Sequence, residues 1–414
     1  AEAGIRDFCL SRGLGDVYKR QGRTTSGSLY ALSKFSIFAF FPVNSSINLI
    51  TSFKETVIFE PTLKVFDFSS PDIFLRAAIT SSINVKSREV VPSPNIVIEL
   101  FAKALLINIG ITAGVEADIC SAEFVQGCNK MDLVLATSNF TKETFMRSVY
   151  DKVNNETQAS EGEVRITKPM GVLSEGIDTD IYQPIPDAGR SDDPFKKQIY
   201  DLIKENFVYL HVGQWGKGGY GEDRKNIAVM IKCFLQAFAN QPSPPALLLK
   251  TNGADFSHLD KADIVKKIEI EKEKFKSADS LPNIYLLHGD LTLEQMALLY
   301  NLPKVKAMLS CTHGEGFGRP LAEATCCDLP VIATGWSGQM DFLNSKQSTL
   351  IDGELKPVPK SMIWKPIIVE PSKWFCADEG DIIRKLRFFK KNHRTLKHQA
   401  KILGQVNRGK HSLD

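Results

Sequence analysis

The sequence predicts an α/β fold in which a mainly parallel sheet is covered by helices on both faces. From residue 207 onward, short apolar runs alternate with helical patterns, and the connections between them are short. One of these runs, 305–310, leads through a glycine-rich loop directly into a helix. With 414 residues, 43% of them hydrophobic and 24% charged, the composition is ordinary for a globular chain of two or three domains.

The elements follow in chain order. In the first part, strands are predicted at 107–112 and 132–137 and helices at 121–130 and 141–149. A polar loop is expected at 151–163. The second part predicts strands at 207–212, 246–250, 283–288, 305–310 and 331–334. Helices are expected between them at 226–238, 262–275 and 292–300, where Thr292 and Gln295 form a capping pattern, and terminal helices at 381–404.

The amino terminus differs from the rest of the chain. Residues 1–21 look like translated adapter sequence, and they are excluded from the fold. Residues 28–109 contain no glycine, whereas a nucleotide-binding type of domain turns on several, so 22–106 is taken as uncertain and mistranslated or foreign. The expected domains are then an incomplete amino-terminal α/β unit at 107–175, a carboxyl-terminal unit at 176–375, and terminal helices at 376–414.

Charge, cysteines and hydropathy exclude several classes of protein. A net charge of +3 gives no reason to expect nucleic acid as a partner. The basic run 384–391 is best interpreted as the solvated face of an amphipathic helix. Eight cysteines without a C-x-x-C pair signal neither zinc nor a disulfide framework, which fits a reducing, cytoplasmic location. No apolar run reaches membrane-spanning length, so we expect a soluble protein, or one in peripheral contact with a membrane at most.

The most informative stretch is H-G-E-G-F-G-R-P-L-A-E-A, residues 313–324. Glu315 precedes a loop whose glycines, Gly316 and Gly318, allow close approach to a ligand, and Glu323 lies about one turn inside the following helix. The free N–H groups at the start of that helix favour negative charge such as phosphate. Taken singly, Glu323 could simply complement the helix dipole and Glu315 could be a solvated loop residue.

The pair of glutamates with G-F-G between them resembles the E-x7-E motif of the GT-B glycosyltransferases, specifically the retaining family 4. The resemblance implies two Rossmann-like domains facing a cleft and a retaining hexosyl transfer. The donor would be a nucleotide diphosphate sugar, with no further cofactor and no metal required. It also implies that Glu315 is catalytic. Donor-binding residues implied by the family pattern are Gly213, Gly289, His313, Gly316, Phe317, Gly318, Leu321 and Glu323.

The segment G-Q-W-G-K-G-G-Y-G-E-D-R-K-N, residues 213–226, is a second candidate site. It follows a strand and precedes a helix, so its amides could cradle a phosphate. Arg224 and Lys225 suit the neutralisation of a diphosphate, and they are the other two catalytic candidates. In family 4 an arginine stands where this chain has Gln214. The segment also contains a formal G-x-G-x-x-G, but no acidic residue follows the next strand, and a polar surface loop remains an alternative.

Two further strand ends carry candidates. Residues 110–116, G-I-T-A-G-V-E, resemble the acceptor side of these transferases through Gly114 and Glu116, although a buried strand end is almost as good an interpretation. Ser138 and Asn139 could be helix caps only. His288 with Gly289 resembles the strand end beside the nucleotide base, and a satisfied core histidine is the safer interpretation of His288.

Residues 168–184 resemble the hinge between the two halves of family 4 enzymes, through Gly176 and Asp178. One departure affects the function. Family 4 often has a histidine in the amino-terminal domain, yet each histidine of this chain lies at residue 211 or later. Three functions therefore stay open: a retaining glycosyltransferase, a non-catalytic or truncated nucleotide-sugar-binding relative, and, with least support, a nicotinamide-dependent oxidoreductase.

Overall fold

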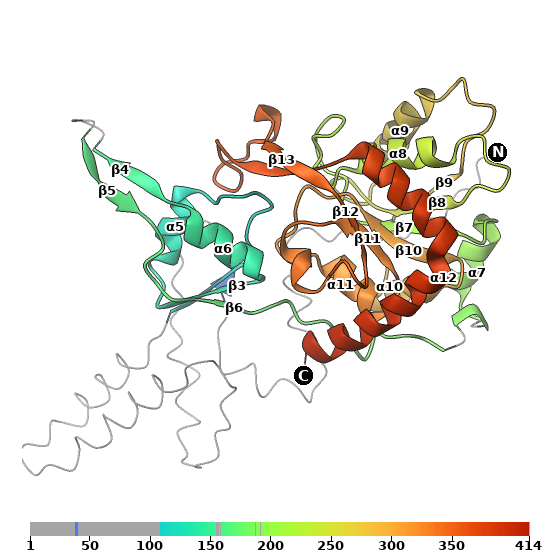
Figure 1. The fold of residues 1–414 in the computed structure, drawn as a ribbon, viewed down its shortest axis with the longest axis horizontal. Helices are drawn as coiled ribbons and strands as arrows, with labels where there is room; N and C mark the ends of the chain where they lie inside the picture. The colour runs from blue at the N-terminus through green and yellow to red at the C-terminus, as the bar shows by residue number, and fades with distance from the viewer. Residues whose placement is uncertain are drawn as a thin grey trace, which may run out of the picture.

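The computed structural model describes residues 38–39, 108–154, 157, 159–186, 188–190 and 192–413, with the backbone alone for 38–39 (Figure 1). The predictions for 1–21, for residue 107 and for nearly all of 22–106 lie outside the described residues. The described elements form two parallel sheets and two hairpins, the first sheet from strands up to residue 172 and the second from strands beyond residue 207. This arrangement confirms the predicted α/β class.

The first sheet has the order β1-β2-β3-β6, and its pairs are parallel. Its strands are β1 (Phe38–Ala39), β2 (Ile109–Thr112), β3 (Leu133–Ala136) and β6 (Met170–Val172). The helices α5 (Ala122–Cys128) and α6 (Asn139–Arg147) begin after Ser121 and Ser138, whose side chains accept hydrogen bonds from amides of the first turn. The predicted strands and helices of this part are confirmed, and β6 is an element that the sequence pattern did not reveal.

The polar segment predicted as a loop at 151–163 is largely a hairpin, so that prediction was wrong. It contains β4 (Tyr150–Val153) and β5 (Ser160–Val164), which pair antiparallel and project from the rest of the unit (Figure 1). Nearly every residue of the two strands is exposed. Alternation of apolar and polar residues marks only a strand with one buried face, so this hairpin leaves no such pattern in the sequence.

The second sheet has the order β12-β11-β10-β7-β8-β9, and its strands are parallel. Its members are β7 (Val208–Val212), β8 (Ala246–Lys250), β9 (Ile284–Leu287), β10 (Val305–Ser310), β11 (Val331–Thr334) and β12 (Thr349–Ile351). The predicted bounds of β8, β10 and β11 are confirmed at both ends. Each of these strands is almost wholly buried, which explains their continuous apolar runs.

The helices of this unit are α7 (Pro194–Leu202), α8 (Ile227–Phe238), α9 (His258–Glu273), α10 (Leu293–Asn301), α11 (Arg319–Cys326) and α12 (Glu379–Lys410). The predicted capping box is present at the start of α10. A second hairpin, β13 (Gly353–Pro357) with β14 (Lys373–Ala377), precedes α12. Neither α7 nor this hairpin was predicted.

Two hydrophobic cores cover the two faces of the second sheet. Leu210, Leu248 and Met308 pack on one face with residues of α7, α10 and α11. Their chain neighbours Tyr209 and Leu247 pack on the other face with residues of α8, α9 and α12. Side chains alternate across a strand, so each strand contributes to both cores. In such folds ligands bind beyond the carboxyl ends of the strands.

The terminal helices predicted at 381–404 are one continuous helix, α12, of 32 residues. Asp378 accepts a hydrogen bond from Asp381 N at its start, and the helix packs on α8 and α11. Just beyond it, Ser412 forms a β-bridge with Ile177, and Ile177 N donates to His411 O at 2.7 Å. The end of the described chain is thus bonded to the linker between the two sheets.

The contact of α12 with α11 depends on a glycine. A Cβ at Gly404 would lie 2.5 Å from the carbonyl oxygen of Thr325, whereas a Cβ at Gly409 would meet no atom within 4 Å. Exchange of glycine for alanine in a helix is favourable by up to about 1 kcal/mol where there is room. We expect Gly404→Ala to lower the free energy of unfolding by about 1–3 kcal/mol, because overpacking costs that much. Urea denaturation measures it.

Gly409→Ala, on the same helix, is the matched control. It should leave the free energy of unfolding unchanged or raise it slightly. Equal effects of the two substitutions would contradict the packing shown for Gly404.

Candidate functional site

The loop between β10 and α11 carries the central motif, and its glycines are required by close contacts. A Cβ at Gly314 would lie 2.8 Å from the carbonyl oxygen of Glu116, and one at Gly316 would overlap the carbonyl oxygen of Ala113. Gly318 has φ +97° and is the N-cap of α11, a conformation that L side chains rarely adopt. The loop is therefore held directly against the amino-terminal unit.

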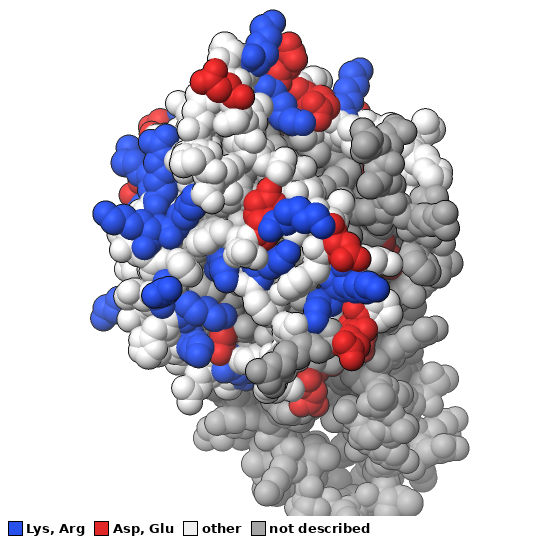
Figure 2. All heavy atoms as spheres, turned by 90° about the vertical axis from the view of Figure 1, so that its right-hand side faces the viewer, with Lys and Arg blue, Asp and Glu red and all other residues white. Residues whose placement is uncertain are grey.

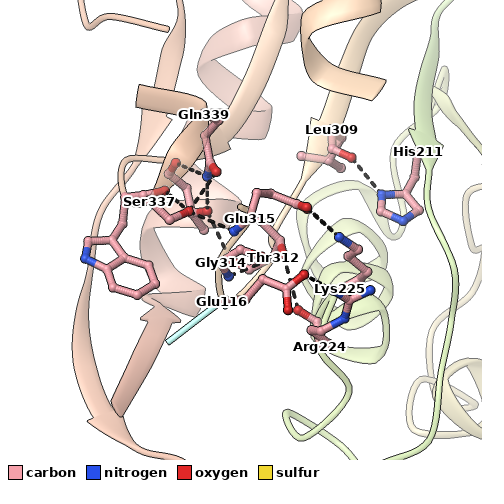
Figure 3. Close-up of polar contacts among 12 residues, drawn as sticks. Glu116, His211, Arg224, Lys225, Leu309, Thr312, Gly314, Glu315, Ser337 and Gln339 are labelled. Atoms are coloured by element: carbon pink, nitrogen blue, oxygen red, sulfur yellow. Dashed lines mark hydrogen bonds and ion pairs between the residues drawn. The ribbon is translucent and has the colours of Figure 1, made fainter. Parts of the chain in front are cut away.

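Lys225 and Glu315 form the centre of the site (Figure 3). The ammonium of Lys225 lies 2.6 Å from both carboxylate oxygens of Glu315, and each side chain is 13% exposed. Burial lowers the pKa of Lys225, and the Glu315 carboxylate opposes this shift. The amide of Glu315 donates to Ser337 Oγ at 2.9 Å, which fixes the backbone at the base of the carboxylate. Two residues predicted to be catalytic are thus in direct contact.

Arg224, the third catalytic candidate, points away from this pair and forms an ion pair with Glu116 of the amino-terminal unit (Figure 3). Glu116 was predicted on the acceptor side, and the structure joins it to the segment 213–226. Several other contacts cross between the units; among them, Ser138 Oγ donates to Gly316 O at 2.5 Å and Asn139 N donates to the Asp341 carboxylate at 2.8 Å. Ser138 is a helix cap, as one interpretation held, and it also bonds to the loop.

Glu323, the second acid of the motif, turns to partners of its own. Arg319 Nε lies 2.9 Å from one carboxylate oxygen and Tyr300 OH lies 3.3 Å from the other. Glu175, which sequence reasoning did not single out, lies in the same region. Burial raises the pKa of Glu175, Arg319 lowers it, and the charges of Glu315 and Glu323 raise it further. The only signal for Glu175 in the sequence is its place just before Gly176.

The remaining donor candidates are placed differently. The side chains of Phe317 and Leu321 are buried in the core, so each can offer a ligand only its backbone. The His313 ring stacks on Trp374 at 4.1 Å, and its two nitrogens lie 2.7 Å from Phe375 O and 3.0 Å from Gly221 O. These contacts hold the central loop between strand β14 and the segment 213–226.

The predicted glycines are spread more widely. Gly213 lies beside the site, where a Cβ would be 3.7 Å from Lys225 Cγ, and Gly114 has φ +81° at the facing turn. Gly289 lies at the end of β9, and its carbonyl accepts from Lys250 Nζ at 2.6 Å. No contact within the described ranges joins Gly289 to the pair of Lys225 and Glu315.

Backbone amides near the site fall into two groups. At the start of α8, the Asp223 carboxylate accepts from Ile227 N at 3.1 Å through both oxygens. The amide of Ile227, just after the segment 213–226, is thus already paired with an acid, and the phosphate-binding role of the amides within 213–226 stays a prediction. The amides of Gly316, Phe317, Gly318 and Arg319 donate to no acceptor in the described part of the chain, and α11 has no side-chain cap. These four N–H groups suit an anion.

His211 lies buried beside Lys225 (Figure 3). Its Nδ1 is 2.9 Å from Leu309 O, and its buried Nε2 has no partner among the described residues. Burial lowers the pKa of His211 to about 4, and the positive charge of Lys225 acts in the same direction. The ring is therefore neutral near pH 7, with Nδ1 as the donor and Nε2 as an unused acceptor.

His211 gives a prediction about acid stability. Because its folded pKa of about 4 lies below the ordinary value of 6.5, the unfolded chain binds the extra proton between these values. The free energy of unfolding should fall as the pH is lowered through this window, by up to about 1 kcal/mol per pH unit. Asp223, whose pKa burial raises to about 6, contributes with the opposite sign.

Comparison of the wild type with His211→Asn isolates the histidine, since the amide can still donate to Leu309 O. Urea denaturation at a series of pH values should show a smaller acid-dependent loss in the variant. His398→Asn, on the exposed face of α12, is the control and should follow the wild type. Identical pH profiles for the wild type and His211→Asn would contradict the assignment.

No group of three or more histidine, cysteine, aspartate or glutamate side chains among the described residues could hold a metal ion. No helix in the described ranges is long and apolar enough to cross a membrane.

Comparison with known proteins supports a fold and leaves the sequence family open. No family model matches the chain, and no curated protein matches it. Among solved structures, HepE of Anabaena in complex with UDP and glucose matches with a TM-score of 0.50 and 14% identity, over 83% of this chain and 80% of that one.

Two further structures match with TM-scores of 0.48. Sucrose-phosphate synthase from Thermosynechococcus elongatus has 14% identity over 75% of this chain and 66% of that one. A glycosyltransferase from Rickettsia africae has 15% identity over 84% and 80%. At such identities a structural match establishes the fold alone. The two parallel sheets and the match to HepE together show that this chain has the GT-B glycosyltransferase fold that its central motif predicted.

Proposed function

We propose that the protein is a retaining glycosyltransferase that moves a sugar from a nucleotide diphosphate sugar to an acceptor of unknown identity. The observation that carries the proposal is the run of four unbonded amides, Gly316 to Arg319, on the loop that also holds Glu315 against Lys225. Together these groups offer a concentrated set of donors to a diphosphate. The fold agrees with this use, and the structure of HepE contains UDP and glucose.

Lys225 is the group best placed to stabilise the leaving diphosphate. An ammonium has three N–H donors, and two of them face the oxygens of Glu315. The third is available to a phosphate oxygen without loss of the ion pair. As the bond between the anomeric carbon and the phosphate oxygen breaks, negative charge develops on the phosphate, so a fixed cation there lowers the barrier. The acceptor hydroxyl takes the place of the diphosphate on the same face of the sugar, and its proton passes to the leaving phosphate.

The other predicted residues take supporting roles in this proposal. Glu315 holds Lys225 and borders the sugar, and Glu323 with Arg319 borders the ribose. Arg224 can reach a phosphate only after it leaves Glu116, so its part in the reaction depends on separation of that ion pair. We propose no metal and no further cofactor for the reaction, and a cytoplasmic location.

A second candidate function is donor binding without turnover. It is favoured by one observation, that Arg224, Lys225, Glu315 and Glu323 are all paired within the protein. The structure gives little support to the third function, a nicotinamide-dependent oxidoreductase. A Cβ at Gly218, a glycine of the formal dinucleotide motif, would lie 2.7 Å from Asp223 N, so this loop folds onto the acid that occupies the start of α8.

Substitution of Lys225 tests the transferase directly. In Lys225→Ala, release of nucleoside diphosphate in the presence of acceptor should fall by about 100-fold or more, because a contact that stabilises the transition state is lost. Lys217→Ala, an exposed lysine of the same loop, is the matched control and should keep full activity. Equal activities of the two variants would rule out the proposed role of Lys225.

Donor binding is tested separately by thermal unfolding with UDP-, GDP- and ADP-sugars. The correct donor should raise the midpoint temperature, since a ligand that binds only the folded state stabilises it. NADH serves as the competing ligand. Stabilisation by NADH and by none of the nucleotide sugars would refute the glycosyltransferase and support the oxidoreductase. Stabilisation by a donor, with no turnover for any acceptor, would favour the binding protein.

A further inference from the structure

The outward face of α12 is strongly positively charged, whereas the rest of the chain has a net negative charge. Ten of the 51 Lys and Arg residues of the chain, and none of its 48 Asp and Glu residues, lie between Ile382 and Lys410. Figure 2 shows Lys and Arg side chains crowded on the left flank of the visible face with few acids among them, whereas elsewhere on that face they lie beside acids. With a net charge of only +3 for the whole chain, the remainder is acidic overall. The basic character is therefore concentrated on one element.

Most of this charge is not neutralised within the protein. Arg384 and Arg408 form ion pairs with Asp381 and Asp328. Others donate only to backbone carbonyl groups, as Lys390 does to Ser243 O. The exposed residues Lys391, Arg394 and Lys401 have no hydrogen bond or ion pair with any described residue. These three cations are the ones most available to an external anion.

Apolar side chains are interleaved with these cations on the same face. Phe388 is 53% exposed, Ile402 40% and Val406 55%. The opposite face of the helix is fully used by the protein core, through Ile382, Leu386, Phe389, Ala400 and Leu403. At 100° per residue, Phe388 and Val406 point in the same direction, with Ile402 and Lys391 within about 60° of them. The helix therefore presents an apolar ridge with a row of cations beside it.

We propose that the outward face of α12 is a docking surface for an anionic lipid membrane. The cations would lie at the level of the lipid phosphates, and the side chains of Phe388, Ile402 and Val406 would enter the headgroup region. Clusters of four to eight basic residues on a helix are attracted to anionic lipids, and interleaved apolar side chains add to the binding. The helix is about 48 Å long and already fixed on the protein, so little conformational freedom is lost on docking.

Two other occupants fit the surface less well. A second copy of this chain would bring two uncompensated basic faces together, and like charges repel. A nucleic acid would satisfy the cations, but it would leave the apolar ridge facing a phosphate backbone. A bilayer satisfies both kinds of side chain at once. The basic run 384–391, taken alone, is explained by a solvated helix face. The basic residues continue to Lys410 with no acid among them, and this longer run favours a binding surface.

Vesicle co-sedimentation of the full chain tests the proposal. The protein should bind vesicles of phosphatidylcholine with phosphatidylglycerol much more tightly than vesicles of phosphatidylcholine alone. In the triple variant Lys391→Gln, Arg394→Gln, Lys401→Gln, the affinity for the anionic vesicles should fall on the order of 100-fold, given the attraction of each basic residue to such a surface. The variant Phe388→Ser, Ile402→Ser, Val406→Ser should also bind more weakly, and its residual binding should vanish at high salt.

The matched control removes three positive charges elsewhere, in Lys130→Gln, Lys266→Gln, Lys276→Gln, and should bind like the wild type. Far-UV circular dichroism checks that each variant is folded. Equal binding to both kinds of vesicle, or an equal loss in the control and the α12 variant, would overturn the proposal. So would unchanged binding of the serine variant, or retention of a DNA duplex in preference to vesicles. The assay needs no donor, so its result is independent of glycosyl transfer.

Discussion

The ion pair of Lys225 and Glu315 is the interaction on which the site depends. Both side chains are largely withdrawn from water, and a buried charge without a partner is costly, so neither can be held there without the other. The pair joins the start of α8 to the loop before α11, and these elements pack on opposite faces of the second sheet. This contact, together with the hydrogen bonds of His313 to Arg224 O and Gly221 O, sets the spacing between two loops at the carboxyl edge of the strands.

Close backbone approach gives the site its second constraint. The glycines of the central loop leave no room for a Cβ against the turn that ends in Glu116, and the carbonyl of Gly316 accepts from Ser138. The amides of Gly316 to Arg319 meet no protein acceptor in the described part of the chain. Packing between the two units and readiness to bind an anion are thus properties of one short segment. A ligand at these amides must fit beside the contact between the units.

The sequence allowed much of the second unit to be predicted, because buried parallel strands such as β8 and β10 are continuous apolar runs. It did not reveal the exposed hairpin β4–β5, which buries too little to leave a periodic pattern. The glycine spacing indicated the site loop, and the loop does pack closely. Asp223 could not be recognised as the group at the start of α8, because that role depends on a turn that only the folded chain shows. The same holds for Glu175.

The bridge between Ile177 and Ser412 affects how the two units can move. The linker is not a free single strand after Gly176, because the end of the described chain is bonded alongside it. A doubled connection resists twisting, and it reaches as far back as Ser174, whose Oγ lies 3.2 Å from His411 Nδ1. Rotation about this connection would change the orientation of Glu175 relative to Arg319. If one unit rotated against the other, the carboxyl group of Glu175, which belongs to the linker, would therefore be the first to change its position.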